Sequence, residues 1–123
     1  MIKYIPAPDI EEKAKHIAVR TEMERDFSRV HFVRSHGSKA KRTLARCHAL
    51  PRVLQTALGV KAHYVVEVIS ENFDKLGEKE KTKVIIHELL HIPKGMKGGF
   101  RQHDYVCGKN IDQIYKNYVN SVN

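Results

Sequence analysis

The segment from residue 78 to residue 93 constrains the fold most strongly, because it predicts an amphipathic helix with a fixed end. Its apolar residues recur at helical spacing: Val84, Ile85, Leu89 and Ile92. Pro93 ends the helix, since the residue before a proline avoids helical geometry. We therefore expect a helix over about residues 78–91.

An H-E-x-x-H sequence, His87-Glu88-Leu89-Leu90-His91, lies in the second half of this expected helix. Residues four apart lie one turn above another, so the imidazoles of His87 and His91 can reach one metal ion from the same face. Glu88 faces to the side, where its carboxylate can accept a proton from water that the metal activates. The motif predicts a Zn²⁺ site that hydrolyses peptide bonds with Glu88 as general base. The alternative is two helix histidines that make ordinary hydrogen bonds, and imidazoles also accept cobalt, nickel or iron.

The third ligand of this site follows by elimination, because a catalytic zinc usually has three protein ligands and one open position. No glutamate follows His91. Positions three and six after it are Lys94 and Lys97, so the extended pattern with glycine and a third histidine there fails. Three glycines between His91 and His103 let the chain turn back toward the ion. His103 is the predicted third ligand, and Asp104 is either its alternative or the acceptor of a hydrogen bond from a ligand imidazole.

The positive charge of the chain is concentrated in residues 27–66, which contain no Asp or Glu. Eight cations lie there: Arg29, Arg34, Lys39, Lys41, Arg42, Arg46, Arg52 and Lys61. The chain has 22 basic and 14 acidic residues, so the remainder carries 14 of each (22 − 8 = 14) and is balanced. Such a segment attracts nucleic acid or acidic protein partners through its long-range field. It supports an alternative function, a nucleic-acid-binding protein with a structural or vestigial zinc site, and a third reading is a solvated basic face.

The remaining segments alternate between short β-prone runs and helical patterns, which predicts an α+β fold. The expected helices lie at 9–27, 51–58 and from 110 onward, and the expected strands at 30–34, 42–50 and 62–70. Asp9 is the expected cap of the first helix, and the strand at 62–70 is expected to hold an extended peptide substrate by strand addition. The apolar stripe of the last helix, which starts at Ile111, indicates core packing.

The length of 123 residues predicts a single domain, 1–123. No apolar run approaches the roughly 20 residues that cross a bilayer, and the first residues lack a signal-peptide pattern, so we expect a cytoplasmic protein without a membrane partner. Cys47 and Cys107 lie far apart in no C-x-x-C spacing, which favours two thiols that behave as small apolar residues.

Two runs of the sequence resemble a known group of proteins. The run His87-Glu88-Leu89-Leu90-His91-Ile92-Pro93, followed by Gly98-Gly99-Phe100-Arg101-Gln102-His103-Asp104, is similar to small metallopeptidases of archaea and phages, which are similar to SprT-like zincins. The resemblance covers about residues 60–107. It implies a minimal zincin-like fold, in which a small mixed sheet packs on helices and the H-E-x-x-H helix lies under the edge strand. It also implies that His87, His91 and His103 are metal ligands and that Glu88 is the catalytic acid and base.

Overall fold

The computed structural model describes residues 1–99, 106 and 108–122. The elements are β1 (Lys3–Pro6), α1 (Pro8–Thr21), the 3-10 turn η1 (Phe27–Arg29), β2 (Val30–His36), β3 (Ala45–Ala49), α2 (Arg52–Leu58), β4 (Tyr64–Ile69), α3 (Ser70–Phe73), α4 (Glu78–His91) and α5 (Gly108–Val122). This mixture of helices and strands confirms the predicted α+β class. None of the helices in the described part of the chain is long and apolar enough to cross a membrane.

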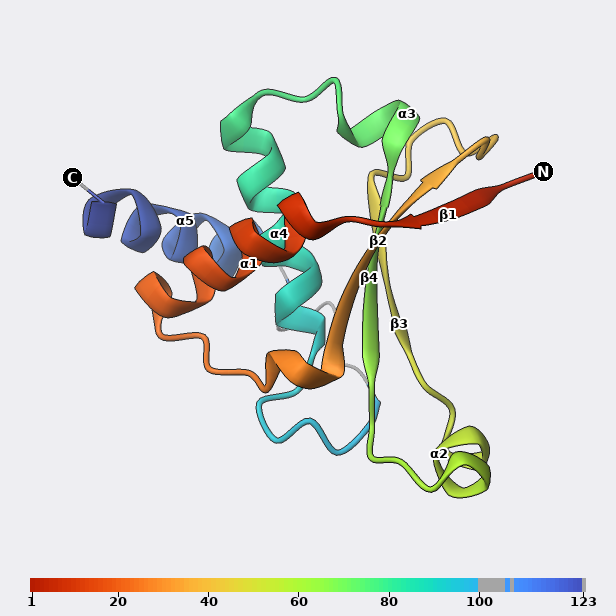
Figure 1. Cartoon of the computed structure of the whole chain (residues 1–123). Helices are drawn as coiled ribbons and strands as arrows, with labels where there is room; N and C mark the ends of the chain where they lie inside the picture. The colour runs from red at the N-terminus through yellow and green to blue at the C-terminus, as the bar shows by residue number, and fades with distance from the viewer. Residues whose placement is uncertain (100–105, 107, 123) are drawn as a thin grey trace.

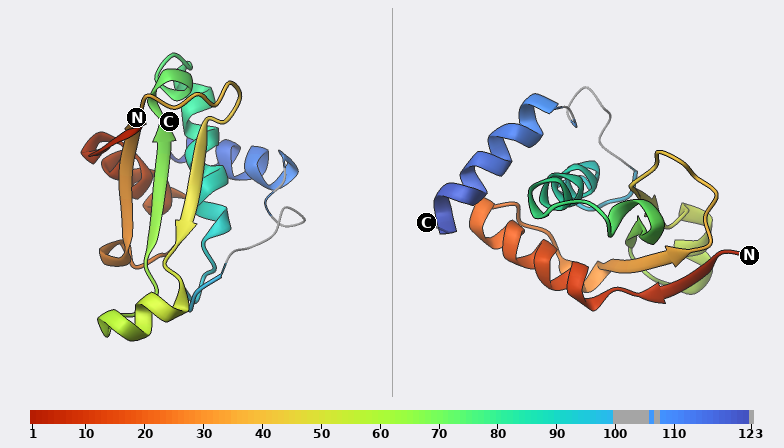
Figure 2. Two further views of the ribbon diagram at one scale, coloured as in Figure 1. Left: turned by 90° about the vertical axis from the view of Figure 1, so that its right-hand side faces the viewer. Right: turned by 90° about the horizontal axis from the view of Figure 1, so that it is seen from above.

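The four strands form one mixed sheet in the order β1-β2-β4-β3. β2 and β4 are parallel, whereas β1 and β3 run antiparallel to their neighbours. Helices α1, α4 and α5 lie on one face of the sheet, and α2 lies beyond the end of β3 (Figures 1 and 2). The arrangement is consistent with a small zincin-like fold.

The position of β4 corrects one expectation. The strand predicted at 62–70 was to receive a substrate peptide, but β4 has β2 on one side and β3 on the other. Both of its edges already carry backbone hydrogen bonds, so no peptide can add to it. Among the residues that the structure describes, the edge near α4 that pairs with no other strand belongs to β3.

The core lies between the sheet and the helices on its covered face. Its buried side chains come from each of these layers and include Ile10, Ala14 and Ile17 of α1, Val66 and Val68 of β4, and Ile85, Ile86 and Leu89 of α4. Full burial of a large aliphatic side chain contributes about 1.5–3 kcal/mol. Because α4 buries these residues, its rotation about its own axis is fixed, and so is the direction in which its histidines point.

The first and last helices lie side by side, as Figure 2 shows from above. The hydroxyl of Tyr118 in α5 is 2.8 Å from Nδ1 of His16 in α1. Arg20 of α1 also donates a hydrogen bond of 3.1 Å to the carbonyl of Ser121. The apolar stripe of α5 packs against the core, as predicted, with Ile111 buried most deeply.

The boundaries of α4 agree with the prediction, but α1 is shorter than expected. It ends at Thr21 rather than near Phe27, because Glu22 adopts a left-handed conformation with φ of 58° and bonds its N–H to the carbonyl of Ala18. The helix also begins one residue before Asp9, which lies in the first turn and makes no cap. A carboxylate there is favoured by the helix dipole instead.

Strand β1 was not predicted. It has four residues, all exposed, and ends in a proline, so neither alternation nor length marks it as a strand. Strands β3 and β4 lie inside the expected ranges 42–50 and 62–70 and are shorter than them. Strand β2 instead continues beyond its expected end at residue 34, as far as His36. Helix α2 fits its prediction closely and ends at Gly59, whose φ of 66° requires the freedom of glycine.

Candidate metal site

The last turns of α4 bring His87, Glu88 and His91 together, with one ligand atom of each within 4.8 Å of the others. The Nε2 atoms of His87 and His91 are 3.2 Å apart. Their ring centroids are farther apart, at 5.0 Å, and the rings are inclined by 67°. The nitrogen edges of the two rings therefore face each other across one helical turn, as the spacing in the sequence predicted.

The separation of these nitrogens can be compared with that in a metal complex. Two imidazole nitrogens bound to one tetrahedral zinc ion, each about 2.0–2.1 Å from it, lie roughly 3.3–3.4 Å apart. The two Nε2 atoms in α4 are 3.2 Å apart, so binding requires only a small movement of the rings. His87 and His91 therefore fit two ligand positions of a divalent transition metal, and their chemistry suits zinc, cobalt, nickel or iron.

Glu88 is buried beside this pair, with 6% of its surface exposed. Its Oε2 lies 4.0 Å from Nε2 of His87. Burial raises the pKa of Glu88 from 4.5 to about 7, because a carboxylate is poorly solvated there. A cation held by the two histidines would lower this pKa again by stabilising the charged form. A carboxyl group that titrates near neutrality can both accept and return a proton.

Cys47 of β3 adjoins Glu88 from the sheet. Burial, and after it the negative charge of Glu88, raises the pKa of the Cys47 thiol to about 12. The thiol is therefore protonated at neutral pH and acts as a small apolar neighbour, in agreement with the prediction for this cysteine. Cys107 lies outside the described residues.

A cavity of about 430 Å³ opens beside His87 and Glu88, between the start of β3, helix α4 and the first turn of α5. Much of its wall is aliphatic and is formed by Leu44, Ala45, Val84 and Ile111. At its edge, Nζ of Lys83 in α4 pairs with the carboxylate of Asp112 in α5 at 3.1 Å. Sequence reasoning did not assign these residues to the site, because nothing in the sequence places α5 next to α4.

The free edge of β3 borders the same region. Ile69 donates its N–H to the carbonyl of Leu44, and Leu50 donates its N–H to the carbonyl of His63. In an antiparallel pair, residues alternate between those that bond to the partner strand and those that do not. The N–H and C=O groups of Ala45, Cys47 and Ala49 therefore point away from β4.

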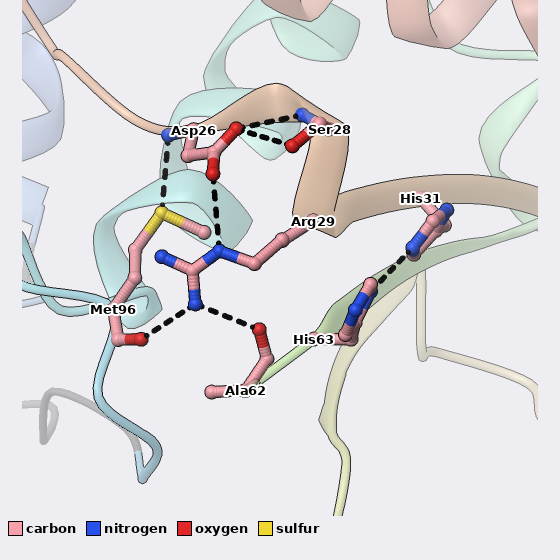
Figure 3. A network of polar contacts seen from close by, with 7 residues as sticks. All are labelled: Asp26, Ser28, Arg29, His31, Ala62, His63 and Met96. Carbon is pink, nitrogen blue, oxygen red and sulfur yellow. Dashed lines mark hydrogen bonds and ion pairs between the residues drawn. The ribbon is translucent and has the colours of Figure 1, made fainter. Parts of the chain in front are cut away.

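The predicted third ligand His103 and its neighbour Asp104 lie outside the described residues, so that assignment stays a prediction. The other histidines make contacts of their own. Nε2 of His31 lies 2.9 Å from Nδ1 of His63 on the sheet (Figure 3). Nε2 of His48 lies 2.7 Å from Oε1 of Glu67. Within the part of the chain that the structure describes, three potential ligand residues converge at the end of α4 alone.

The basic segment 27–66 is partly neutralised by acidic residues outside it. Arg34 pairs with both Asp9 and Asp74, and Arg29 pairs with Asp26. Lys39, Lys41, Arg42, Arg46 and Arg52 are exposed. Binding of nucleic acid or of an acidic partner by this surface stays a prediction.

The whole chain was also compared with known proteins. Residues 2–122 match the model of a family described as "Putative phage metallopeptidase". No curated protein and no solved structure matches the chain. The matched range contains all of α4, including the convergent histidines and the buried carboxyl group beside them.

Proposed function

Since the chain belongs to this phage metallopeptidase family over residues 2–122, which implies a metal cofactor, we propose that it is a zinc-dependent peptidase with Glu88 as its general base. The observation that carries the proposal is the pair of Nε2 atoms of His87 and His91, 3.2 Å apart beside a buried glutamate. Two imidazoles at this separation can share a hydrogen bond or hold one ion between them, and the family match supports the ion.

His87 and His91 would hold the zinc ion from α4, and His103 would complete the ligand set on the sequence argument given above. When bound, zinc makes a water molecule more acidic and polarises the carbonyl group of the scissile peptide. The role of the protein is to fix the ligands and to leave one position open to substrate.

Glu88 would receive the proton of the attacking water on a carboxylate oxygen. It would then deliver that proton to the nitrogen of the leaving amine as the peptide bond breaks. Its burial supports this role, because the carboxyl group is held by packing in α4 and bulk water does not compete for the proton. The thiol of Cys47 lies close by and stays protonated, so it adds no second base.

The substrate would bind as an extended peptide along the free edge of β3. The outward N–H and C=O groups of Ala45, Cys47 and Ala49 supply hydrogen bonds to its backbone, as in other cases of strand addition. A peptide there passes the cavity beside His87 and Glu88, whose aliphatic wall suits a large apolar side chain next to the scissile bond.

The proposal is tested by measuring the metal content of the purified chain together with His91→Ala and His103→Ala. We expect about one zinc per chain, lost in His91→Ala and much reduced in His103→Ala. Hydrolysis of a quenched fluorescent peptide library should then require zinc and should disappear in Glu88→Gln, with the metal content unchanged. A chain that takes up no zinc when zinc is added has structural histidines in α4, and the proposal is wrong.

A further inference from the structure

The loop that follows α4 has an unusual backbone. Met96 adopts a left-handed conformation with φ of 49°, although it is not a glycine and is buried. Gly98 and Gly99 follow with φ of 106° and 77°. A left-handed non-glycine residue is strained and persists only where its surroundings impose it. Contacts with neighbouring elements must therefore hold residues 92–99 in this conformation.

Arg29 of η1 holds the middle of this loop (Figure 3). One guanidinium nitrogen, Nη1, donates to the carbonyl of Met96 at 3.1 Å and to the carbonyl of Ala62 at 3.0 Å. Its Nε donates to the carboxylate of Asp26 at 3.1 Å. A single side chain thus joins the loop after α4 to the residues before β2 and β4.

Asp26 contributes a second contact to the same point. Its backbone N–H lies 3.1 Å from Sδ of Met96, which turns inward toward η1 (Figure 3). The start of the loop is held separately, because Nε of Arg25 donates to the carbonyl of Ile92 at 3.1 Å. The loop is therefore fixed at its start and its centre by residues that precede β2.

Tyr64 holds the far end. Its side chain is fully buried at the start of β4, and its hydroxyl accepts the N–H of Gly98 and donates to the carbonyl of Gly99, both at 3.1 Å. This hydroxyl contacts the last two residues of the loop that the structure describes. Gly99 is only four positions before His103 in the sequence.

We propose that Arg29 and Tyr64 are positioning residues for the metal. They fix residues 92–99, which follow the helix ligand His91 and precede the predicted ligand His103, so that less chain freedom is lost when zinc binds. The inference rests on the proposed function, because it takes His103 as the third ligand. Groups that orient metal ligands from outside typically account for about 10–100-fold in metal affinity, and preorganisation acts by lowering the cost of ordering.

A purely structural role for Arg29 makes a different prediction. The substitution would then lower the free energy of unfolding of the metal-free chain, and it would change zinc affinity equally whether or not His103 is present. If Arg29 acts through the third ligand, its effect on affinity must disappear when that ligand is removed. A double-mutant cycle separates these cases, because it isolates the coupling between two positions.

The experiment measures zinc affinity of the full chain by competition with a chromophoric chelator. We expect Arg29→Met to lower the affinity about 10-fold or more, and Arg29→Lys to lower it too, because an ammonium group lacks the rigid fork of donors. The matched control is Arg20→Met, which removes an exposed arginine that bonds to α5 rather than to the loop, and its affinity should equal that of the wild type. Tyr64→Phe, which removes one oxygen and keeps the buried ring, should lower the affinity and serves if the Arg29 variants fail to fold.

The cycle is completed with His103→Ala alone and combined with Arg29→Met. We expect both to bind zinc equally weakly. Unchanged affinity in Arg29→Met and Tyr64→Phe, or the same loss in the presence and absence of His103, would overturn the inference while leaving the proposed zinc site intact. Absence of zinc binding in the wild type would instead overturn the proposed function and, with it, this inference.

Discussion

The alternation of backbone groups along β3 leads to a prediction about Ala45. Because its N–H points away from β4, Ala45→Pro removes a donor that the sheet does not use. Proline is tolerated at edge positions of this kind. The backbone groups of Arg46 point toward β4, where Arg46 and Glu67 form a hydrogen-bonded pair. Arg46→Pro therefore removes a hydrogen bond of the sheet itself.

The magnitudes follow from this difference. Arg46→Pro leaves the carbonyl of the buried Glu67 without its donor, which costs about 1–3 kcal/mol. With about 2.1 cal/mol/K of unfolding entropy per residue over 123 residues, or roughly 0.26 kcal/mol/K, that loss lowers Tm by about 4–12 °C. Ala45→Pro should lower Tm by less than this. It should instead remove one hydrogen bond to the substrate, worth about 1 kcal/mol, and so reduce kcat/KM about 5-fold.

Thermal unfolding, monitored by circular dichroism, measures the loss of Tm. Hydrolysis of a short fluorogenic peptide measures the loss of kcat/KM separately. Equal losses of Tm in Ala45→Pro and Arg46→Pro would show that the backbone groups of β3 that point toward β4 have been wrongly assigned. A stable Ala45→Pro with unchanged kcat/KM would show that the substrate does not pair with this part of the edge.

Three further predictions concern the metal, the cavity and the charges. Free zinc at 100 times its Kd should stabilise the chain by about 2.7 kcal/mol, or roughly 10 °C in Tm, and a thermal scan of His91→Ala should show no such shift. Ile111→Trp should narrow the cavity and reduce kcat/KM about 10-fold or more for peptides with a large apolar residue beside the scissile bond. In a matched peptide series, kcat/KM for the peptide with glycine at that position should not change. Arg34 holds the pKa of Asp9 below its ordinary value of 3.8, so their ion pair stabilises the fold above that pH and is lost as the pH falls through the lowered value. Urea unfolding should therefore show a difference between the wild type and Arg34→Met that is largest at neutral pH and shrinks below pH 3.8, and a difference independent of pH would contradict this.

Local sequence signals predicted the metal-binding helix well. The apolar spacing of α4 and the proline that follows it determine both its face and its end, and helical geometry then brings His87 and His91 together without any tertiary information. The end of α1 had no such signal, because a glutamate rather than a glycine takes the left-handed position after Thr21. Strand β1 also had no local sequence signal, because its four residues become a strand by pairing with β2.

Contacts between distant elements set the limit of prediction for the site. The strand order decides which edge is free, and the near-continuous apolar run from Val65 to Ile69 is typical of an interior strand of a sheet rather than of an edge strand. That run therefore contained a signal for the central position of β4 that the strand-addition prediction did not use. No pattern links Arg29 or Tyr64 to the loop after α4, because each bonds to backbone groups, which carry no sequence identity.

The packing of α5 beside α1 affects the order in which the chain can fold during synthesis. His16 and Tyr118, which touch in the folded protein, are 102 positions apart. At a translation rate of about 5–20 residues per second, roughly 5–20 s pass between the synthesis of these two residues. For that time the first helix can form and collapse onto nascent strands, but the side that α5 covers stays open to solvent or to a chaperone. The packing of α1 against α5 therefore forms only after α5 is translated, not progressively from the N-terminal end.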